Sequence, residues 1–122
     1  MGKNGLVIDD EPNISEAISC ILARDGWSVA THSNGHDAVG VVQNAMPDLV
    51  ILDVMLPGKT GYDILRELRS EDATQGLPVL MLTAKGQVKD REMAERAGAS
   101  RFMTKPCSNA EVLDAVRELV TG

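Results

Sequence analysis

Short apolar runs alternate along the chain with longer segments in which apolar residues recur at helical spacing. Five runs have the composition expected of strands, at positions 5–8, 28–31, 49–52, 79–82 and 101–104. A helical pattern follows each run: from Pro12 to a stop at Asp25-Gly26, over 35–45, after Thr60, over roughly 87–97, and after Ser108. This alternation predicts a doubly wound α/β fold, a five-stranded parallel sheet with helices on both faces.

The two runs at 49–52 and 79–82 have no polar residue at alternate positions. This pattern is typical of parallel strands that are buried on both faces. The run at 49–52 ends at Asp53 and is the most hydrophobic of the five. We therefore expect it at the centre of the sheet.

Several residues mark where helices begin. Pro12 suits a first helical turn, where its missing N–H costs nothing. Thr60 and Asp63 resemble a capping box with Asp in place of Glu or Gln, and Ser108 with Glu111 forms the usual pair. The helix at 35–45 is expected to place one apolar face on the sheet, formed by Ala38, Val41, Val42 and Ala45.

The composition fits one folded domain spanning residues 1–122. At 43% hydrophobic residues the chain can bury a core, which excludes a disordered protein. Trp27, Tyr62 and Phe102 are its three aromatic residues, so the core must be mainly aliphatic. Trp27 is expected to pack where the first helix gives way to the second strand.

The net charge of −6 argues against direct binding of nucleic acid by this domain, which usually requires a basic surface. Cys20 and Cys107 lack metal-ligand or redox spacing, which indicates a reduced, cytoplasmic protein. Cys20 is expected to face the core or its boundary, and Cys107 to lie in a loop. No apolar stretch has the length of a signal peptide or a membrane span, so no membrane association is expected.

Polar residues stand at the carboxyl ends of four of the five predicted strands. Asp9 and Asp10 follow the first, Asp53 the third, Thr83 ends the fourth and Lys105 follows the fifth. In a parallel sheet these ends meet at one edge, where ligands bind. The five side chains are therefore expected to share one pocket.

Three carboxylates in one pocket repel each other, by roughly 3 kcal/mol per pair at about 5 Å and an effective dielectric of about 20. Lys105 offsets part of this repulsion, and a hard divalent cation such as Mg²⁺, which prefers oxygen ligands, would offset the rest. Asp53, with a metal, a hydroxyl and a lysine beside it, suits phosphoryl transfer, which depends on positioning and charge neutralisation. Its place on the central strand makes Asp53 the strongest candidate for the nucleophile.

Four segments in order, VIDDEP, LVILDVMLPGKTG, VLMLTAK and ASRFMTKP, resemble the receiver domains of two-component response regulators, of the CheY-like kind. The resemblance extends from about Leu6 to Val120, and the spacing of the four motifs makes it specific. It implies a flavodoxin-like (βα)5 fold with strand order 2-1-3-4-5. It also implies a phosphoacceptor rather than an enzyme, with Mg²⁺ as the cofactor.

The resemblance also assigns roles to the metal site. Asp53 would be the phosphoacceptor. Asp10 and Asp53 would bind Mg²⁺ through their side chains and Met55 through its backbone carbonyl, while Asp9 would act largely through water.

The resemblance also implies which residues would respond to phosphorylation. Thr83 would donate a hydrogen bond to the phosphoryl group, Lys105 would pair with it, and Phe102 would be the aromatic switch residue. The Lys105–Pro106 bond is typically cis in the family. These changes would remodel the face made by the fourth helix, the fifth strand and the fifth helix.

The implied partners are a sensor histidine kinase or a phosphotransfer protein as donor, and an output partner or a phosphorylation-dependent homodimer. Receivers that pair as winged-helix transcription factors do often carry an acidic residue before the aromatic and an aromatic after Lys-Pro. Arg101 and Cys107 stand at those positions here, which weakens that form of pairing. Two alternatives stay open for the output: a complete single-domain regulator, or the receiver of a longer protein.

Other functions fit the sequence less well. A Mg²⁺-dependent phosphatase of the haloacid dehalogenase type needs a second Asp two residues after the nucleophile, where this chain has Met55. A flavodoxin or dinucleotide module needs a Gly-rich phosphate turn after the first strand, where this chain has DDEPN. A receiver that works without phosphorylation is disfavoured because all five expected site residues are present.

Overall fold

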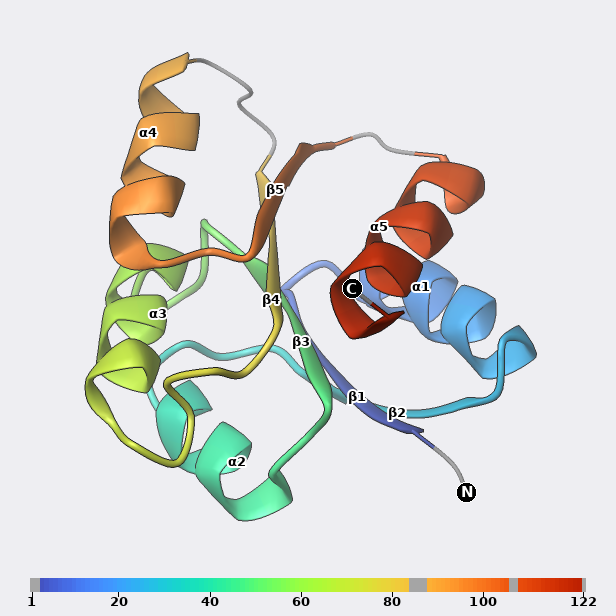
Figure 1. The fold of residues 1–122 in the computed structure, drawn as a ribbon, viewed down its shortest axis with the longest axis horizontal. Helices are drawn as coiled ribbons and strands as arrows, with labels where there is room; N and C mark the ends of the chain where they lie inside the picture. The colour runs from blue at the N-terminus through green and yellow to red at the C-terminus, as the bar shows by residue number, and fades with distance from the viewer. Residues whose placement is uncertain (1–2, 84–87, 106–107, 122) are drawn as a thin grey trace.

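The computed structural model describes residues 3–83, 88–105 and 108–121 of the chain. Five parallel strands form one sheet in the order β2-β1-β3-β4-β5, as the sequence and the resemblance predicted (Figure 1). The most hydrophobic strand is the central one, and both of its neighbours pair with it in parallel register. The strands are β1 (Lys3–Ile8), β2 (Trp27–His32), β3 (Leu49–Asp53), β4 (Val79–Thr83) and β5 (Arg101–Thr104).

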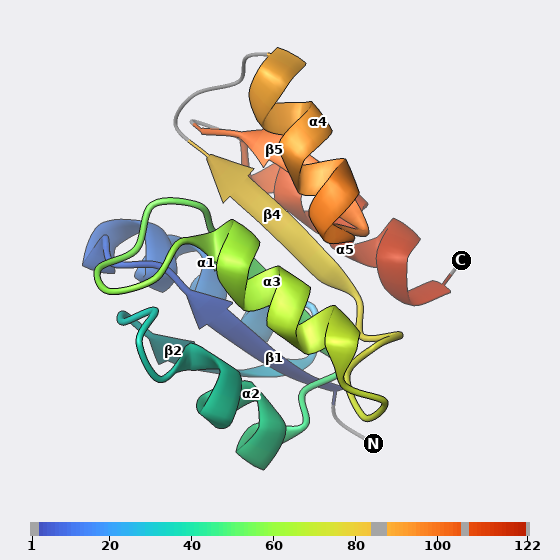
Figure 2. The same ribbon diagram turned by 90° about the vertical axis from the view of Figure 1, so that its left-hand side faces the viewer.

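Helices cover both faces of the sheet (Figures 1 and 2). α1 and α5 lie on one face, and α2, α3 and α4 lie on the other. Within residues 3–83, 88–105 and 108–121, no helix combines the length and the apolar character needed to cross a membrane. The helices are α1 (Pro12–Arg24), α2 (Ala38–Ala45), α3 (Gly61–Ser70), α4 (Val88–Ala97) and α5 (Asn109–Thr121).

Two hydrophobic layers, one on each face, explain the uninterrupted apolar runs of β3 and β4. Side chains of a strand point alternately to the two faces, so Val50 and Leu52 pack under α2, α3 and α4, while Leu49 and Ile51 pack under α1 and α5. All five residues of β3 and all five of β4 are buried. Trp27 begins β2 and is only 5% exposed, as expected.

The predicted helix starts at Pro12 and Ser108 are confirmed. Pro12 opens α1. The Ser108 Oγ accepts a hydrogen bond from the Glu111 N–H at 3.1 Å, and a Glu111 carboxylate oxygen accepts one from the Ser108 N–H at 3.1 Å. At α3, the Thr60 Oγ1 accepts a hydrogen bond from the Asp63 N–H at 3.2 Å.

The predicted start of α2 is wrong by three residues, because residues 35–37 form a turn ahead of Ala38. Gly35 is held against the loop after β3, where its N–H donates to the Pro57 carbonyl at 3.0 Å. A Cβ at Gly35 would lie 2.4 Å from the Lys59 carbonyl oxygen, so this close contact fixes the turn. Ala45, expected on the buried face, is exposed at the end of the short helix.

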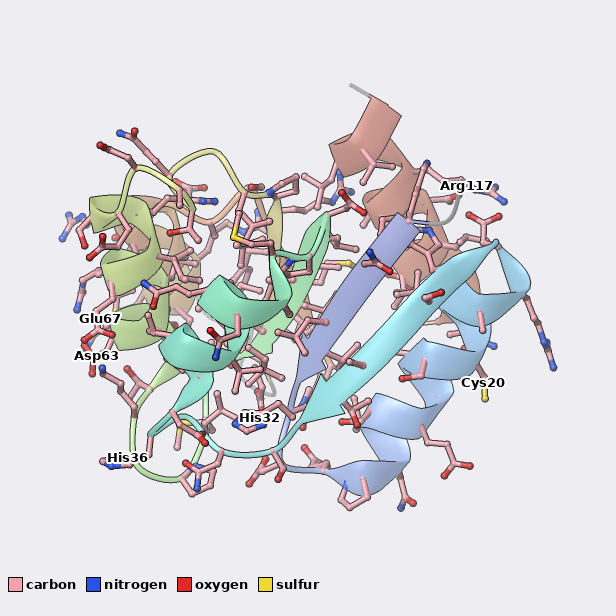
Figure 3. The ribbon with its side chains drawn as sticks, turned by 90° about the horizontal axis from the view of Figure 1, so that it is seen from below. Cys20, His32, His36, Asp63, Glu67 and Arg117 are labelled. Atoms are coloured by element: carbon pink, nitrogen blue, oxygen red, sulfur yellow. The ribbon has the colours of Figure 1, made fainter. Side chains whose placement is uncertain are left out.

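The expectation that Cys20 faces the core or its boundary is wrong. Cys20 is exposed and points outward from α1 (Figure 3). The buried face of α1 is formed by Ser15, Ile18 and Leu22. Residues two apart on a helix point in nearly opposite directions, so Cys20 lies opposite its buried neighbours at 18 and 22.

Gly61 lets α3 start directly against the end of β3, and replacing it with Ala is expected to destabilise the fold by about 1–3 kcal/mol. A Cβ at Gly61 would lie 2.3 Å from the Asp53 carbonyl oxygen and 3.0 Å from the Met81 Cε. Gly40→Ala is a matched control, since Gly40 is in α2 with no atom within 4 Å of an added Cβ. There the same change should stabilise by roughly 0.5–1 kcal/mol. Urea unfolding of the two variants measures both effects, and equal stability would contradict the packing argument.

Candidate functional site

Backbone hydrogen bonds beyond the strand ends bring the predicted site residues to one edge of the sheet. The Asp9 N–H donates to the His32 carbonyl at 3.0 Å, which continues the pairing of β1 with β2. The Lys105 N–H donates to the Thr83 carbonyl at 2.7 Å, which continues that of β5 with β4. Asp53 ends β3 in register with Leu82 of β4. Asp9, Asp53, Thr83 and Lys105 therefore stand at neighbouring strand ends.

The Lys105 ammonium is the centre of the site. Its Nζ lies 2.8 Å from Asp9 Oδ2, 3.1 Å from Glu11 Oε1 and 3.5 Å from Asp53 Oδ1. The side chains of Asp9, Asp53 and Lys105 are 1%, 4% and 9% exposed, whereas that of Glu11 is 58% exposed. The structure thus brings together three of the predicted residues and adds a fourth that the sequence analysis missed.

Glu11 could have been noticed as the third acidic residue in the run DDE. It was missed because an acidic residue just before Pro12 is typical of an ordinary solvated helix start. Only the tertiary structure places it beside Lys105, which is 94 residues away in the sequence.

Burial dominates the electrostatics of Asp53. Burial, and after it the nearby Asp9 carboxylate, raises the pKa of Asp53 from 3.8 to about 6. Lys105 and a hydrogen bond from the Met55 backbone N–H act in the opposite direction. Burial lowers the pKa of Lys105, but the contacts with Asp9, Asp53 and Glu11 outweigh it and leave that pKa raised. The site therefore favours the charged form of Lys105. Lys105 alone does not offset the effect of burial and of Asp9 on Asp53, so a further positive charge would favour the ionised Asp53.

The residues present fit a divalent cation. Carboxylate oxygens of Asp9, Asp10, Glu11 and Asp53 lie within 4.8 Å of one another. Asp9 Oδ2 is fully buried and has no hydrogen-bond donor in the part of the chain that the structure describes, since the Lys105 contact is an ion pair without hydrogen-bond alignment. A buried carboxylate oxygen left in this state is stabilised by a bound cation. Hard oxygen donors of this kind suit Mg²⁺.

The remaining predicted residues lie on β4, just after β3 and on β5. Thr83 is 3% exposed at the end of β4. Met55 follows β3, and its side chain is 68% exposed. Phe102 is half-buried on β5, and the Arg91 guanidinium of α4 lies 5.9 Å from its ring centroid. Pro106 and Cys107, which the sequence analysis also named, lie outside the described residues.

An open cavity of about 480 Å³ adjoins the acidic cluster between the carboxyl ends of β1 and β2 and the start of α1. Asp9 and Asp10 form one wall, and Ser15, Glu16 and His32 are among the other lining residues. The acidic cluster is therefore open to solvent from this side, which gives a small ligand or ion a route to the carboxylates.

Known proteins resemble this chain in sequence and in fold. The family model of the response regulator receiver domain matches residues 6–117. A mycobacterial relative, "Probable transcriptional regulatory protein TcrX" of Mycobacterium tuberculosis, is 45% identical over 115 residues, which are 94% of this chain and 48% of the relative. The chain thus spans about half the length of that relative.

Two solved structures have nearly the same backbone. The signal receiver domain of a signal transduction histidine kinase from Syntrophus aciditrophicus superposes with a TM-score of 0.91 at 30% identity, covering 99% of this chain and 92% of that one. The receiver domain of a sensor histidine kinase from Pseudomonas aeruginosa PAO1, which has a magnesium ion coordinated in its active site cleft, superposes with a TM-score of 0.91 at 27% identity and covers 100% of both chains. With a matching family model, fold and acidic cluster, this chain belongs to the response regulator receiver domain family of two-component systems.

Proposed function

We propose that Asp53 is the phosphoacceptor of this receiver domain and that it takes its phosphoryl group from a phosphohistidine of a sensor histidine kinase or phosphotransfer protein. The observation that carries the proposal is the buried Asp53 carboxylate beside Lys105 and Asp9 at the carboxyl edge of the sheet. A carboxylate in this position can act as a nucleophile once its negative charge is balanced.

We assign Mg²⁺ to the acidic cluster, held by the side chains of Asp10 and Asp53 and the backbone carbonyl of Met55, with Asp9 acting through water. When bound, the ion supplies positive charge that ionises Asp53 and neutralises the transferring phosphoryl group. The full burial of Asp9 Oδ2 and the close approach of the four carboxylates support this assignment.

The chain's own residues then perform the transfer. An Asp53 oxygen forms a bond to phosphorus as the bond from phosphorus to the donor imidazole nitrogen breaks, and that nitrogen keeps the electron pair. Lys105 balances the charge on the phosphoryl oxygens, because its ammonium is already within 3.5 Å of Asp53. The domain is changed by this step and does not turn over a separate substrate, so we propose a phosphoacceptor rather than an enzyme.

The output would follow from rearrangement around the phosphoryl group. Thr83 would move to donate a hydrogen bond to it, and Phe102 would rotate inward, remodelling the face of α4, β5 and α5. The Arg91 guanidinium over the Phe102 ring would have to give way in that rotation. A longer relative bears the name of a transcriptional regulator, so we propose transcriptional control as one output, exerted through a partner or a homodimer. The cytoplasmic location expected from the sequence stays a prediction.

Intact-mass measurement with a small-molecule phosphoryl donor tests the proposal. The wild-type chain should gain one phosphoryl group in Mg²⁺ and none in EDTA. No mass gain in Mg²⁺ would refute the proposed function. Sustained release of phosphate from an ester would instead support the aspartyl-phosphate phosphatase, the alternative that Met55 disfavours.

Met55 is expected to make the phosphorylated form long-lived, with a lifetime of many minutes or more, because a thioether cannot hydrogen-bond an attacking water as an amide or acid could. Met55→Asn should speed the decay of phosphoprotein about tenfold, the worth of one transition-state hydrogen bond of roughly 1.4 kcal/mol. Decay is followed by intact mass in Mg²⁺ after removal of the donor. Met46→Asn is the matched control, since Met46 is also exposed, at 54%, and has a backbone φ of 45° that Asn tolerates. A wild-type half-life of seconds would contradict the argument.

A further inference from the structure

The Glu11 side chain does not cap the helix that follows it. Glu11 occupies the position before α1, yet its side chain makes no hydrogen bond to the backbone N–H groups of the first turn. Its backbone is fixed on both sides: its N–H donates to Asp9 Oδ1 at 2.9 Å, and its carbonyl accepts from the N–H groups of Ile14 and Ser15 at 3.1 Å each. The local backbone is therefore held in place by other bonds, and the Glu11 carboxylate is available for a contact elsewhere.

That contact is with Lys105. The Lys105 ammonium donates a hydrogen bond to Glu11 Oε1 at 3.1 Å, joining the start of α1 to the end of β5. Glu11 differs from the other two partners of Lys105 in its exposure, 58% against 1% for Asp9 and 4% for Asp53. It keeps a negative charge in contact with water at little desolvation cost.

A divalent cation and the Lys105 ammonium compete for the same oxygens. The ammonium lies 2.8 Å from Asp9 Oδ2 and 3.5 Å from Asp53 Oδ1, which belong to the cluster assigned to the cation. Two cations on the same pair of carboxylates repel each other strongly in a buried site. The ammonium must therefore shift toward a partner that the cation does not require.

We propose that Glu11 is a positioning residue that holds the Lys105 ammonium at the rim of the site while a divalent cation is held by Asp10 and Asp53, with Asp9 acting through water. This inference rests on the proposed function and deepens it. By keeping Lys105 beside the site, Glu11 removes a competitor of the cation and leaves the ammonium within reach of an incoming phosphoryl oxygen. The contact also explains why the Glu11 side chain leaves the helix end uncapped.

A double-mutant cycle on Mg²⁺ affinity separates positioning from simple charge. Mg²⁺ is added stepwise to the full chain, and binding is read from backbone amide chemical shifts near Asp53. Glu11→Gln should weaken the affinity about three- to tenfold, because Lys105 falls back onto the metal-binding carboxylates. In a Lys105→Met background the same change should alter the affinity less than about twofold.

Two further variants complete the test. Glu16→Gln removes the same charge from an exposed site on α1 that lines the adjoining cavity without contacting Lys105 within the described residues, and should leave the affinity near wild type. Glu11→Asp keeps the charge but shortens the side chain by one methylene, so it should weaken Mg²⁺ binding as Glu11→Gln does. This variant keeps Lys105 and so tests the inference even where Lys105→Met does not fold.

Three results would overturn the inference: an unchanged affinity in Glu11→Gln, an equal loss with and without Lys105, or wild-type behaviour in Glu11→Asp. The second would make Glu11 a direct ligand or a general source of negative charge. Failure of the wild-type chain to bind Mg²⁺ at all is a different outcome. It would refute the proposed metal site, and the role of Glu11 with it.

Discussion

Asp53→Asn is expected to abolish phosphorylation of this domain by a small-molecule donor in Mg²⁺. An amide lacks the anionic oxygen that must attack phosphorus, while its size and shape leave the surrounding packing intact. The buried position of Asp53, 4% exposed between Asp9 and Lys105, leaves little room for another carboxylate to replace it. The measurement is the intact mass of the variant and of the wild type after equal times with the donor.

Asp63→Asn serves as the matched control, because it makes the same chemical change on an exposed side chain at the start of α3. It should be phosphorylated at the wild-type rate. If Asp53→Asn still gained one phosphoryl group as readily as wild type, the assignment of the phosphoacceptor would be wrong, and Asp9 and Asp10 would become the residues to replace next.

The sequence predicted the sheet well because its signals are local. The unbroken apolar runs of β3 and β4 follow from burial on both faces, and each run ends at a polar residue where the strand leaves the core. The polar residues at the ends of these runs also predicted which side chains lie close together, since parallel strands bring their carboxyl ends to one edge of the sheet. The contacts of Lys105 with Asp9 and Asp53 confirm this meeting, whereas the roles proposed for these residues stay predictions.

Other features depend on contacts between distant segments, which periodicity does not encode. From the sequence alone, Glu11 is a typical solvated residue at the start of a helix, and only the fold places it beside Lys105 at the end of β5. The start of α2 depends on the close approach of Gly35 to the loop after β3. The exposure of Cys20 could not be predicted from its residue type, because a free cysteine is usually buried. Here Ile18 and Leu22 define the buried face of α1, and Cys20 lies on the opposite face.

The raised pKa of Asp53 likewise needs the structure, and it predicts a large effect on stability. Without divalent cations, Asp53→Asn is expected to increase the free energy of unfolding by about 1–3 kcal/mol above roughly pH 6. Burial, and after it the Asp9 carboxylate, raises the pKa of Asp53 from 3.8 to about 6, so the folded wild type holds an unfavourable charge at neutral pH. Asn carries no such charge, and Lys105 keeps Asp9 and Glu11 as partners in the variant.

The difference in the free energy of unfolding between Asp53→Asn and the wild type is expected to depend on pH. Between about pH 4 and pH 6 the folded wild type binds the Asp53 proton more tightly than the unfolded chain does, so the contribution of Asp53 to stability falls as the pH rises through that window. The variant lacks this loss, and the difference should grow from near zero at about pH 4 to its full size above about pH 6.

Urea unfolding in EDTA at a series of pH values measures that difference. The carboxyls of Asp25 and Asp37, whose pKa values are lowered by hydrogen bonds to Arg117 and His32, affect both proteins alike and cancel in it. Added Mg²⁺ should reverse the order of stability, because a cation bound by the ionised Asp53 stabilises the wild type by mass action and the variant much less. A difference that stays constant from acid to neutral pH would show that Asp53 ionises in the folded protein as easily as in the unfolded chain.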